Sequence, residues 1–363
     1  MKIQSLNFYN FSIPLTRPLA FSDVPLSLRE GIIVHMISDR GDMGFGEASP
    51  LPGVSSEPLK KVAHQLKVLK SDLAGREVPD DPVPLMNWLM SNLPTETMAP
   101  SVRFGIESAI MSMAASLRKK SVAEFLHGKP SKAIFTAGAL QGAQMDVLRE
   151  AAVLRSLNYE VFDIVVGNRN VPLEVQKIER LKDVLGARAR LRINAGRSWS
   201  LDEAVLFARS IGKNQVEFIE EPCADMGQWE KFYLQSDIPF AAGSGFSDDL
   251  CERFEGIQGL GALVFRPTVS GGITGFWKAL QRARERGCRL ILASSLESGL
   301  GLTVLANLSV LTGEPPGIGS CRWLGADLLE RPLIHEAGLV FAKDLLINSQ
   351  IFRGEFKRQI QIV

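Results

Sequence analysis

The sequence lacks a surplus of charge of either sign. Its 363 residues carry 41 Lys and Arg against 40 Asp and Glu, a formal net charge of +1. Proteins that bind nucleic acid or an anionic membrane surface through charge usually carry a basic excess. The balanced charge therefore argues against nucleic acid and against a charged membrane surface as partners.

Long apolar runs are also missing. A helix that crosses a bilayer needs about 18 or more apolar residues in succession, and no part of the sequence contains such a run. The first residues, MKIQSLNFYNFSIPL, alternate apolar and polar side chains, whereas a signal peptide needs a continuous apolar stretch and a small-residue cleavage site. We therefore expect a cytoplasmic protein that has no membrane association.

Cysteine and histidine are scarce, and their spacing argues against several kinds of site. The cysteines form no Cys-x-x-Cys pair, so neither a disulfide framework nor a zinc site is indicated, and we expect buried thiols. The histidines are scattered over different predicted elements, which gives no support to a His-based triad or metal cluster. These residues are Cys223, Cys251, Cys288 and Cys321, and His35, His64, His127 and His335.

A change of periodicity along the chain is the main positive signal. Residues 1–50 alternate as antiparallel strands do, and residues 57–126 follow a helical period with glycine stops. Between residues 133 and 313, an apolar strand and an amphipathic helix follow one another seven times. A degenerate last unit would complete a (β/α)8 barrel, and a doubly wound open sheet is the alternative. The lack of a glycine-rich phosphate turn after the first strand of this region argues against the open sheet.

These patterns predict an α/β protein with three parts. Residues 1–128 form an α+β capping domain, residues 129–326 form a modified TIM-like barrel, and residues 327–363 return to the capping domain. Active sites of such barrels lie at the carboxyl ends of the strands. The expected strand ends are Ala139, Gln141, Asp163, Val165, Asn194, Glu220, Gly243, Arg266 and Ser294 to Glu297.

Six segments occur in a fixed order: GFGEASPLPGVSSE (44–57), SVRFGIES (101–108), FIEEP (218–222), RPTVSGG (266–272), SSLESGLGL (294–302) and GIGSCRWLGADLL (317–329). Together they resemble the enolase superfamily, and within its muconate-lactonizing subgroup the o-succinylbenzoate synthases of menaquinone biosynthesis. The resemblance covers essentially the whole chain and implies an enolase-type capping domain with a modified (β/α)8 barrel. It also implies a reaction: a proton α to a carboxylate is abstracted, Mg²⁺ stabilises the enediolate, and water is lost.

The base positions that the resemblance implies are substituted. The lysine pair of the second barrel strand falls on Asp163 and Val165, and the lysine of the sixth strand falls on Arg266. Valine has no ionisable group, and arginine stays protonated in proteins. We therefore expect the standard base to be absent, with Asp163 and Arg266 as the remaining candidate catalytic residues.

The metal positions that the resemblance implies are substituted as well. The three carboxylate ligands fall on Asn194, Glu220 and Gly243, so only Glu220 keeps its charge. Mg²⁺ binds through one or two carboxylates together with water and substrate oxygens. We expect Mg²⁺ binding at Glu220 to be weak or lost, and we expect no other cofactor.

Two arrangements are predicted at the barrel mouth. Asp163 and Arg266 would form a charge pair across it, or each would meet only solvent; a buried unpaired charge costs several kcal/mol. Arg266 would alternatively hold a ligand carboxylate through its planar fork. The anion pocket around Arg266 would be completed by Ser294, Ser295, Gly271 and Gly272.

Glu47, in the capping domain, is expected to fix the loop that closes over the barrel rather than to act as an acid.

Three functions are left open. The main expectation is an o-succinylbenzoate synthase-like protein that has lost the standard chemistry and keeps a pocket for a small carboxylate metabolite. The second is a divergent lyase or isomerase that uses Asp163 as acid or base and Arg266 for the anion. The third is a weak genuine synthase in which Glu220 and the substrate hold Mg²⁺. A homo-oligomer is also left open.

Overall fold

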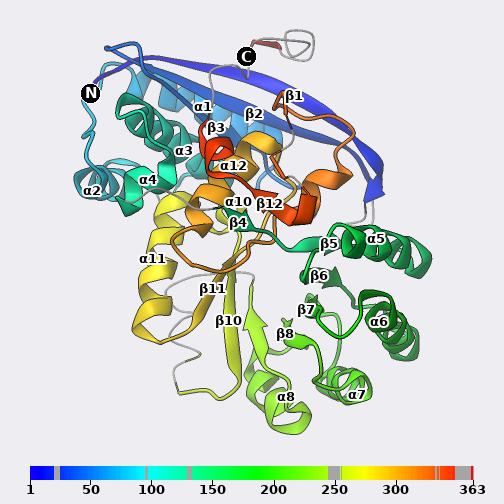
Figure 1. The fold of residues 1–363 in the computed structure, drawn as a ribbon. Helices are drawn as coiled ribbons and strands as arrows, with labels where there is room; N and C mark the ends of the chain where they lie inside the picture. The colour runs from blue at the N-terminus through cyan, green and yellow to red at the C-terminus, as the bar shows by residue number, and fades with distance from the viewer. Residues whose placement is uncertain are drawn as a thin grey trace.

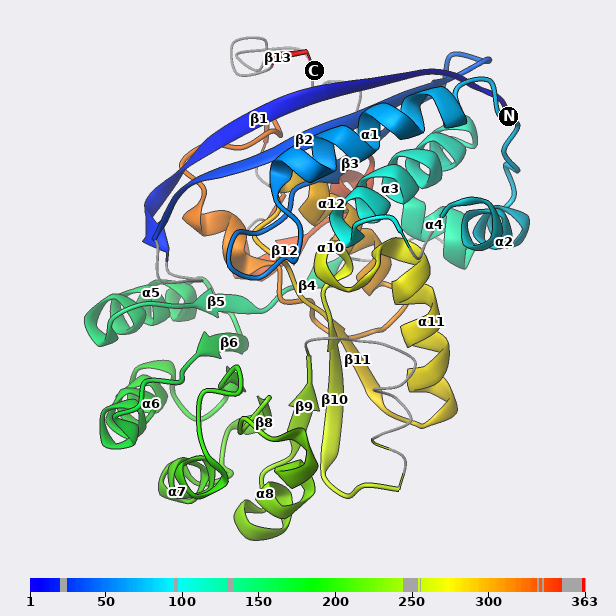
Figure 2. The ribbon, with the colours of Figure 1, turned by 180° about the vertical axis from the view of Figure 1, so that it is seen from behind.

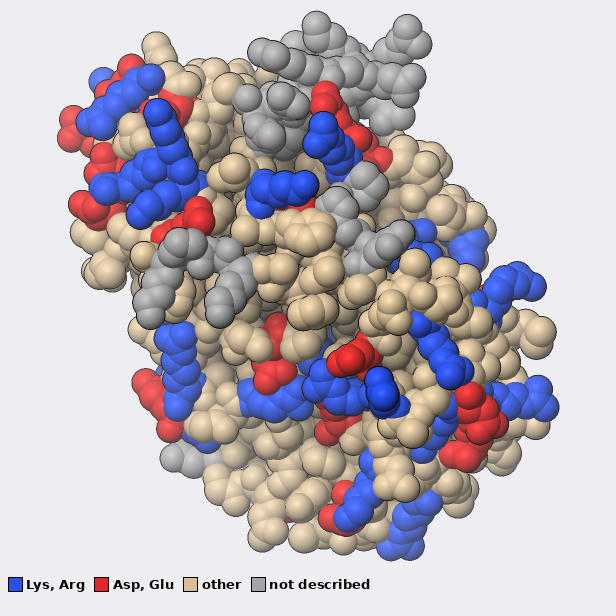
Figure 3. Space-filling view, in the orientation of Figure 1, with Lys and Arg blue, Asp and Glu red and all other residues tan. Residues whose placement is uncertain are grey.

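The computed structural model describes residues 1–19, 25–94, 97–128, 133–243, 254, 256–331, 333–334, 336–347 and 361–362. Cys251, His335 and much of the predicted tail lie outside these residues. An antiparallel sheet with its helices lies on one side of a ring of parallel strands (Figure 1). Basic and acidic side chains are interspersed over the face seen in Figure 3. No helix in the described ranges is long and apolar enough to span a bilayer.

The first sheet is antiparallel, as the alternation over residues 1–50 predicted. Its strand order is β13-β1-β2-β3, so the end of the chain lies beside β1. Apolar side chains at alternate positions of β1, such as Leu6 and Phe8, are buried against the helices, and so is Ile3, on the far side of a register shift near the start of the strand. The strands are β1 (Ile3–Leu19), β2 (Leu26–Ser38), β3 (Met43–Ala48) and β13 (Gln361–Ile362).

Among the described residues, four helices complete the capping region, and α3 packs directly on β3 (Figure 2). Glycines in β3 permit this close approach: a Cβ atom at Gly46 would lie 2.0 Å from the Gly105 carbonyl oxygen, and one at Gly44 would lie 2.0 Å from that of Ala109. The alternating glycines at residues 44 and 46 therefore set the distance between strand and helix. The helices are α1 (Leu59–Leu73), α2 (Pro82–Asn92), α3 (Pro100–Leu117) and α4 (Val122–His127).

Seven parallel strands form the second sheet, in the order β11-β10-β9-β8-β7-β6-β5. Helices lie on its outer face (Figure 1). The strands are β5 (Gly138–Leu140), β6 (Val161–Val165), β7 (Arg190–Asn194), β8 (Val216–Glu220), β9 (Phe240–Ala242), β10 (Leu260–Phe265) and β11 (Arg289–Leu292). The helices are α5 (Gln144–Ser156), α6 (Val171–Leu185), α7 (Leu201–Ile211), α8 (Trp229–Ser236), α10 (Pro267–Ser270), α11 (Gly272–Glu285) and α12 (Gly299–Ser309).

A short segment after α12 closes the ring. Gly317 donates its N–H to Leu292 and accepts from the Ser294 N–H, and Pro316 accepts from the Ala137 N–H, at 2.8, 2.9 and 2.9 Å. The chain at residues 316–317 thus lies between β11 and β5 in the place of an eighth strand. The prediction of a barrel closed by a degenerate last unit is confirmed, and the open-sheet alternative is wrong.

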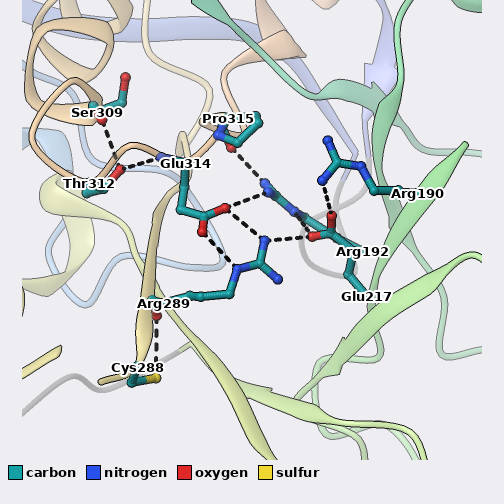
Figure 4. A network of polar contacts seen from close by, with 9 residues as sticks. All are labelled: Arg190, Arg192, Glu217, Cys288, Arg289, Ser309, Thr312, Glu314 and Pro315. Atoms are coloured by element: carbon teal, nitrogen blue, oxygen red, sulfur yellow. Dashed lines mark hydrogen bonds and ion pairs between the residues drawn. The ribbon is translucent and has the colours of Figure 1, made fainter. Parts of the chain in front are cut away.

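A charged network fills the barrel at the amino-terminal ends of its strands (Figure 4). Glu217 of β8 pairs with Arg190 and Arg192 of β7 at 3.1 and 2.8 Å. Arg289 of β11 pairs with Glu217 and with Glu314, at 3.0 and 2.8 Å. Arg192 is almost fully buried, and its charge is compensated by the carboxylates of Glu217 and Glu314 rather than by solvent.

Buried polar contacts join the capping region to the barrel, beside an apolar cluster that includes Phe11 and Leu300. Glu47 of β3 accepts hydrogen bonds from the backbone N–H groups of Ser298 and Gly301, at 3.1 and 3.0 Å, and from two serine hydroxyls. Arg29 donates to the carbonyl groups of Pro50 and Leu296, at 2.8 and 2.6 Å. Glu47 therefore joins β3 to the start of α12, which fits the structural role expected for it.

Three details differ from the sequence predictions. The predicted strand at 133–140 is two strands, because β4 (Ile134–Phe135) pairs with β12 (Leu339–Val340) and only β5 enters the barrel. Residues 339–340 therefore lie beside the segment that leads into β5, while 361–362 join the capping sheet. Cys223 is a buried thiol as expected, whereas Cys288 and Cys321 are half-buried.

Candidate functional site

A cavity of about 530 Å³ lies at the carboxyl ends of the barrel strands. Leu51 and Val54, in the loop after β3, line it from the capping side, and Trp323 lines it from the chain that follows the closing segment. Its polar lining comes from strand ends. The predicted site residues in the lining are Asp163, Val165, Asn194, Glu220, Gly243, Arg266, Ser294 and Ser295, and the other expected strand ends in it are Ala139, Gln141 and Leu296.

Strand register places these residues in two layers. Val165, Asn194 and Glu220 are register partners at the ends of β6, β7 and β8. Two residues earlier on each of the first two strands, Asp163 is the partner of Arg192. Because side chains alternate along a strand, each pair separated by two residues faces the same side. The upper layer thus carries an amide and a carboxylate, and the lower layer carries Asp163 and Arg192.

Glu220 is held by Arg266 through both of its oxygens. Arg266 Nη1 lies 2.7 Å from Glu220 Oε1, and Nη2 lies 3.1 Å from Oε2. Burial lowers the pKa of Arg266, but the contact with Glu220 outweighs it and raises the pKa above its ordinary value, so the guanidinium keeps its charge. Such bidentate pairs are among the strongest hydrogen bonds in proteins.

The predicted pair between Asp163 and Arg266 is therefore wrong. No ion pair joins these two described residues, since both terminal nitrogens of Arg266 are directed at Glu220. Glu220 is on β8 and Arg266 follows β10, and the strand between them, β9, is followed directly by Gly243, which has no side chain to separate them. Asn194 completes the group, since its Nδ2 donates to Glu220 Oε2 at 3.0 Å. We call Asn194, Glu220, Gly243 and Arg266 the strand-end cluster.

The strand-end cluster does not fit a divalent metal ion. Glu220 is 5% exposed, and its two oxygens accept three hydrogen bonds from Arg266 and Asn194. The neighbouring Glu221 is paired with Arg197 at 3.2 Å. In the described part of the chain, no group of three or more His, Cys, Asp or Glu side chains is placed to hold a metal. A cation brought to Glu220 would meet the positive charge of Arg266.

Asp163 is the lining carboxyl that remains outside these pairs. It is half-buried, and within the described ranges it has neither a hydrogen bond nor an ion pair. Burial raises the pKa of Asp163 to about 6, Arg192 and Arg266 oppose this rise, and Glu220 adds to it. A carboxyl group with a pKa near neutrality, next to a cavity, can exchange a proton with a ligand.

The two predicted serines lie in the lining, but the two predicted glycines do not. The Ser294 hydroxyl is 2.7 Å from that of Ser320, and Ser295 Oγ is buried without a hydrogen-bond partner. Gly271 caps α10, where its N–H donates to the Pro267 carbonyl, and a Cβ at Gly272 would lie 2.5 Å from Glu107 Oε2 of α3. That part of the anion-pocket prediction is wrong, because the two glycines pack towards the capping helix.

Comparison with known proteins places this fold in a family. The family described as enolase C-terminal domain-like matches residues 143–343, and the MenC N-terminal domain matches residues 3–113. The chain belongs to the enolase superfamily. It is similar to the o-succinylbenzoate synthase of Haemophilus influenzae, at 28% identity over 316 residues, which are 85% of this chain and 87% of that protein.

Further enolase-superfamily relatives agree. The o-succinylbenzoate synthase of Proteus mirabilis is 28% identical over 340 residues, which are 92% of this chain and 93% of that protein. Two solved structures share the fold at lower identity. The L-Ala-D/L-Glu epimerase of Bacillus subtilis has a TM-score of 0.84, 19% identity and coverage of 94% and 96% of the two chains. The muconate lactonizing enzyme of Pseudomonas fluorescens has a TM-score of 0.82, 18% identity and 94% coverage of both.

Sequence reasoning overlooked two residues of this enolase-superfamily site. Arg192 lines the cavity beneath Asn194, and the alternation in RLRIN would have revealed it, because residues 192 and 194 face the same side of β7. Ser320 meets Ser294 from the chain after the closing segment. No local pattern marks Ser320, since its place depends on how the barrel closes.

Proposed function

We propose that this o-succinylbenzoate synthase-like protein binds a small carboxylate metabolite in its barrel cavity and does not perform the metal-dependent dehydration of its relatives. The observation that carries the proposal is the engagement of both Glu220 oxygens by Arg266. A carboxylate that neutralises a guanidinium is not available to a metal ion that would stabilise an enediolate. A cytoplasmic location and a homo-oligomer stay predictions.

The substituted base positions support the same proposal. Val165 has no group that can accept a proton, and Arg266 stays protonated, so neither position supplies a base. Positioned acid–base catalysis contributes about 10² to 10⁴-fold to typical enzymatic rates. Loss of both the base and the metal would remove the two main contributions to proton abstraction next to a carboxylate.

The cavity lining suits a ligand with an apolar body and a polar end. Leu140, Phe218 and Ile291 are among its apolar side chains. Ser295 lines the cavity, but its Oγ is buried without a hydrogen-bond partner, so the hydroxyl would have to turn towards the cavity to donate to a ligand oxygen. Protonated Asp163 would be a second donor, which would favour an anionic ligand at acidic pH.

A second candidate function rests on Asp163 itself. Its pKa of about 6 suits a general acid or base near neutral pH, so a divergent lyase or isomerase could use it on a carboxylate substrate without a metal. This activity would survive chelators and would be lost in Asp163→Asn.

The deciding assay is the dehydration of the synthase substrate, a succinyl-hydroxycyclohexadiene carboxylate, followed by loss of its diene absorbance. We expect no turnover above the uncatalysed rate, with Mg²⁺ or with a chelator. Chelator-sensitive turnover would contradict the proposal and favour a weak genuine synthase. Chelator-resistant turnover that Asp163→Asn abolishes would favour the second candidate. Binding is measured separately by calorimetry with o-succinylbenzoate and short dicarboxylates, and no heat with any of them would refute the carboxylate pocket.

A further inference from the structure

The strand-end cluster joins three strands through one buried side chain. Glu220 ends β8, Asn194 ends β7, and Arg266 follows β10, so every hydrogen bond to Glu220 in the cluster crosses from one strand to another. The guanidinium supplies the positive charge that the buried carboxylate needs. We infer that Arg266 acts as a built-in cation: it holds these strand ends together and excludes a divalent metal from Glu220.

Gly243 is a requirement of this arrangement. A Cβ atom at residue 243 would lie 2.0 Å from Glu220 Oε1 and 3.2 Å from Arg266 Nη1. Any side chain there would displace the end of Glu220 and break the bidentate contact. An aspartate at this position is therefore incompatible with the present positions of Glu220 and Arg266.

Asn194 is required as a hydrogen-bond donor to Glu220, whereas Gly243 is required for its lack of a side chain. The Asn194 amide nitrogen donates to Glu220 Oε2 at 3.0 Å. A carboxylate of the same shape has no proton to donate at neutral pH and would place a second negative charge beside Glu220. The bonded contact would become a repulsion, with Arg266 as the single nearby cation of the cluster.

The three substituted positions therefore form one unit. Arg266 supplies the charge, Gly243 supplies the room, and Asn194 supplies the third donor for Glu220. A carboxylate introduced at residue 194 or 243 alone is expected to lower the stability of the folded protein. Carboxylates at both positions together with the loss of Arg266 would remove the built-in cation and make Glu220 available to a metal ion. This inference goes beyond the proposed ligand binding, because it concerns the protein without its ligand.

Thermal unfolding of the full chain tests the unit. The wild type should unfold at the same temperature with excess Mg²⁺, excess Mn²⁺ or a chelator. Arg266→Met leaves Glu220 buried without its counter-charge and should lower the midpoint by about 4 to 7 °C. The matched control is Lys213→Met, which breaks the exposed pair with Asp237 and should change the midpoint little. An Arg266→Met midpoint equal to that of the control would refute the holding role.

Mn²⁺ binding, measured by electron paramagnetic resonance, tests the exclusion. Wild type should bind no Mn²⁺ at Glu220, and the triple variant Asn194→Asp/Gly243→Asp/Arg266→Met should bind one equivalent that further replacement of Glu220→Gln removes. Stoichiometric binding by the wild type that Glu220→Gln abolishes would refute the inference, and so would a folded triple variant that binds none. If the triple variant does not fold, Arg266→Met alone decides the matter: Mn²⁺ should raise its unfolding midpoint and leave that of the wild type unchanged.

These outcomes are distinguishable from those of the proposed function. Metal-independent turnover by the wild type would overturn the proposed loss of chemistry but leave the built-in cation intact. Metal-dependent turnover would overturn both. Absence of any ligand binding would refute the carboxylate pocket and would not affect the unfolding or Mn²⁺ results.

Discussion

Replacement of Asp163 by asparagine should make the protein more stable at neutral pH. The carboxyl has an ordinary pKa of 3.8, and burial raises it to about 6 in the folded protein. Between these values the folded state holds a proton that the unfolded state has released, so stability falls as the pH rises through this range. Above about pH 6 the carboxyl is ionised in the folded protein as well, and the free energy of unfolding is then reduced by the full cost of burying this charge.

The magnitude follows from the size of the shift. Each pKa unit corresponds to about 1.4 kcal/mol, so a rise of about two units corresponds to about 3 kcal/mol. This is an upper value, because Asp163 is half-buried and solvent in the cavity screens part of its charge. Asparagine has nearly the same shape and no charge, so the variant should avoid this cost at pH 7 and differ little from the wild type near pH 4.

Denaturant unfolding followed by tryptophan fluorescence, at a series of pH values from about 4 to 8, measures this difference. The wild type should lose stability relative to Asp163→Asn as the pH rises, with most of the change between about pH 4 and 6. Asp183→Asn removes an exposed carboxyl on α6 and is the matched control, for which the difference should stay constant. A constant difference for Asp163→Asn as well would refute the raised pKa.

Three further outcomes are expected. Affinity for a carboxylate ligand should decrease as the pH rises through about 6, where Asp163 loses its proton, and a flat calorimetric profile between pH 5 and 8 would contradict this. Gly46→Ala should destabilise by about 1 to 3 kcal/mol in denaturant unfolding, because its Cβ would lie 2.0 Å from the Gly105 carbonyl oxygen; an unchanged midpoint would mean that α3 shifts freely. Glu47→Ala should lower the free energy of unfolding by about 3 kcal/mol, because the Ser298 N–H loses its buried acceptor. A decrease of less than about 1 kcal/mol would show that water replaces the carboxylate.

Local patterns in the sequence determined the architecture. The alternation over residues 1–50 fixes which side of the first sheet is buried, and the repeated strand and helix segments require a parallel sheet covered by helices. The strand ends followed from the same repeat, so Asn194 and Glu220 could be assigned to one end of the barrel before their contacts were known. The identities of Val165 and Arg266 showed that these two positions supply no base.

The closing segment shows where local patterns stop. Residues 316–317 fill the eighth position of the barrel with backbone hydrogen bonds and have no strand-like run of their own. The division of residues 133–140 between β4 and β5 depends on pairing with residues 339–340, about two hundred positions later in the sequence. Such pairings depend on which segments the fold brings together, and propensity does not encode them.

The partner of each charge was decided by the tertiary structure. From sequence, Arg266 could pair with Asp163, with a ligand or with solvent, because all three satisfy the same electrostatic requirement. In the fold, β9, the strand between β8 and β10, is followed by Gly243, and the absence of a side chain there lets Glu220 reach the guanidinium. Asp163, one layer lower on β6, is left beside Arg192 in a site where burial raises its pKa. The sequence therefore determined which residue types lie at the strand ends. Only the tertiary structure determined that Glu220 pairs with Arg266, because the pair needs the space that Gly243 leaves between β8 and β10.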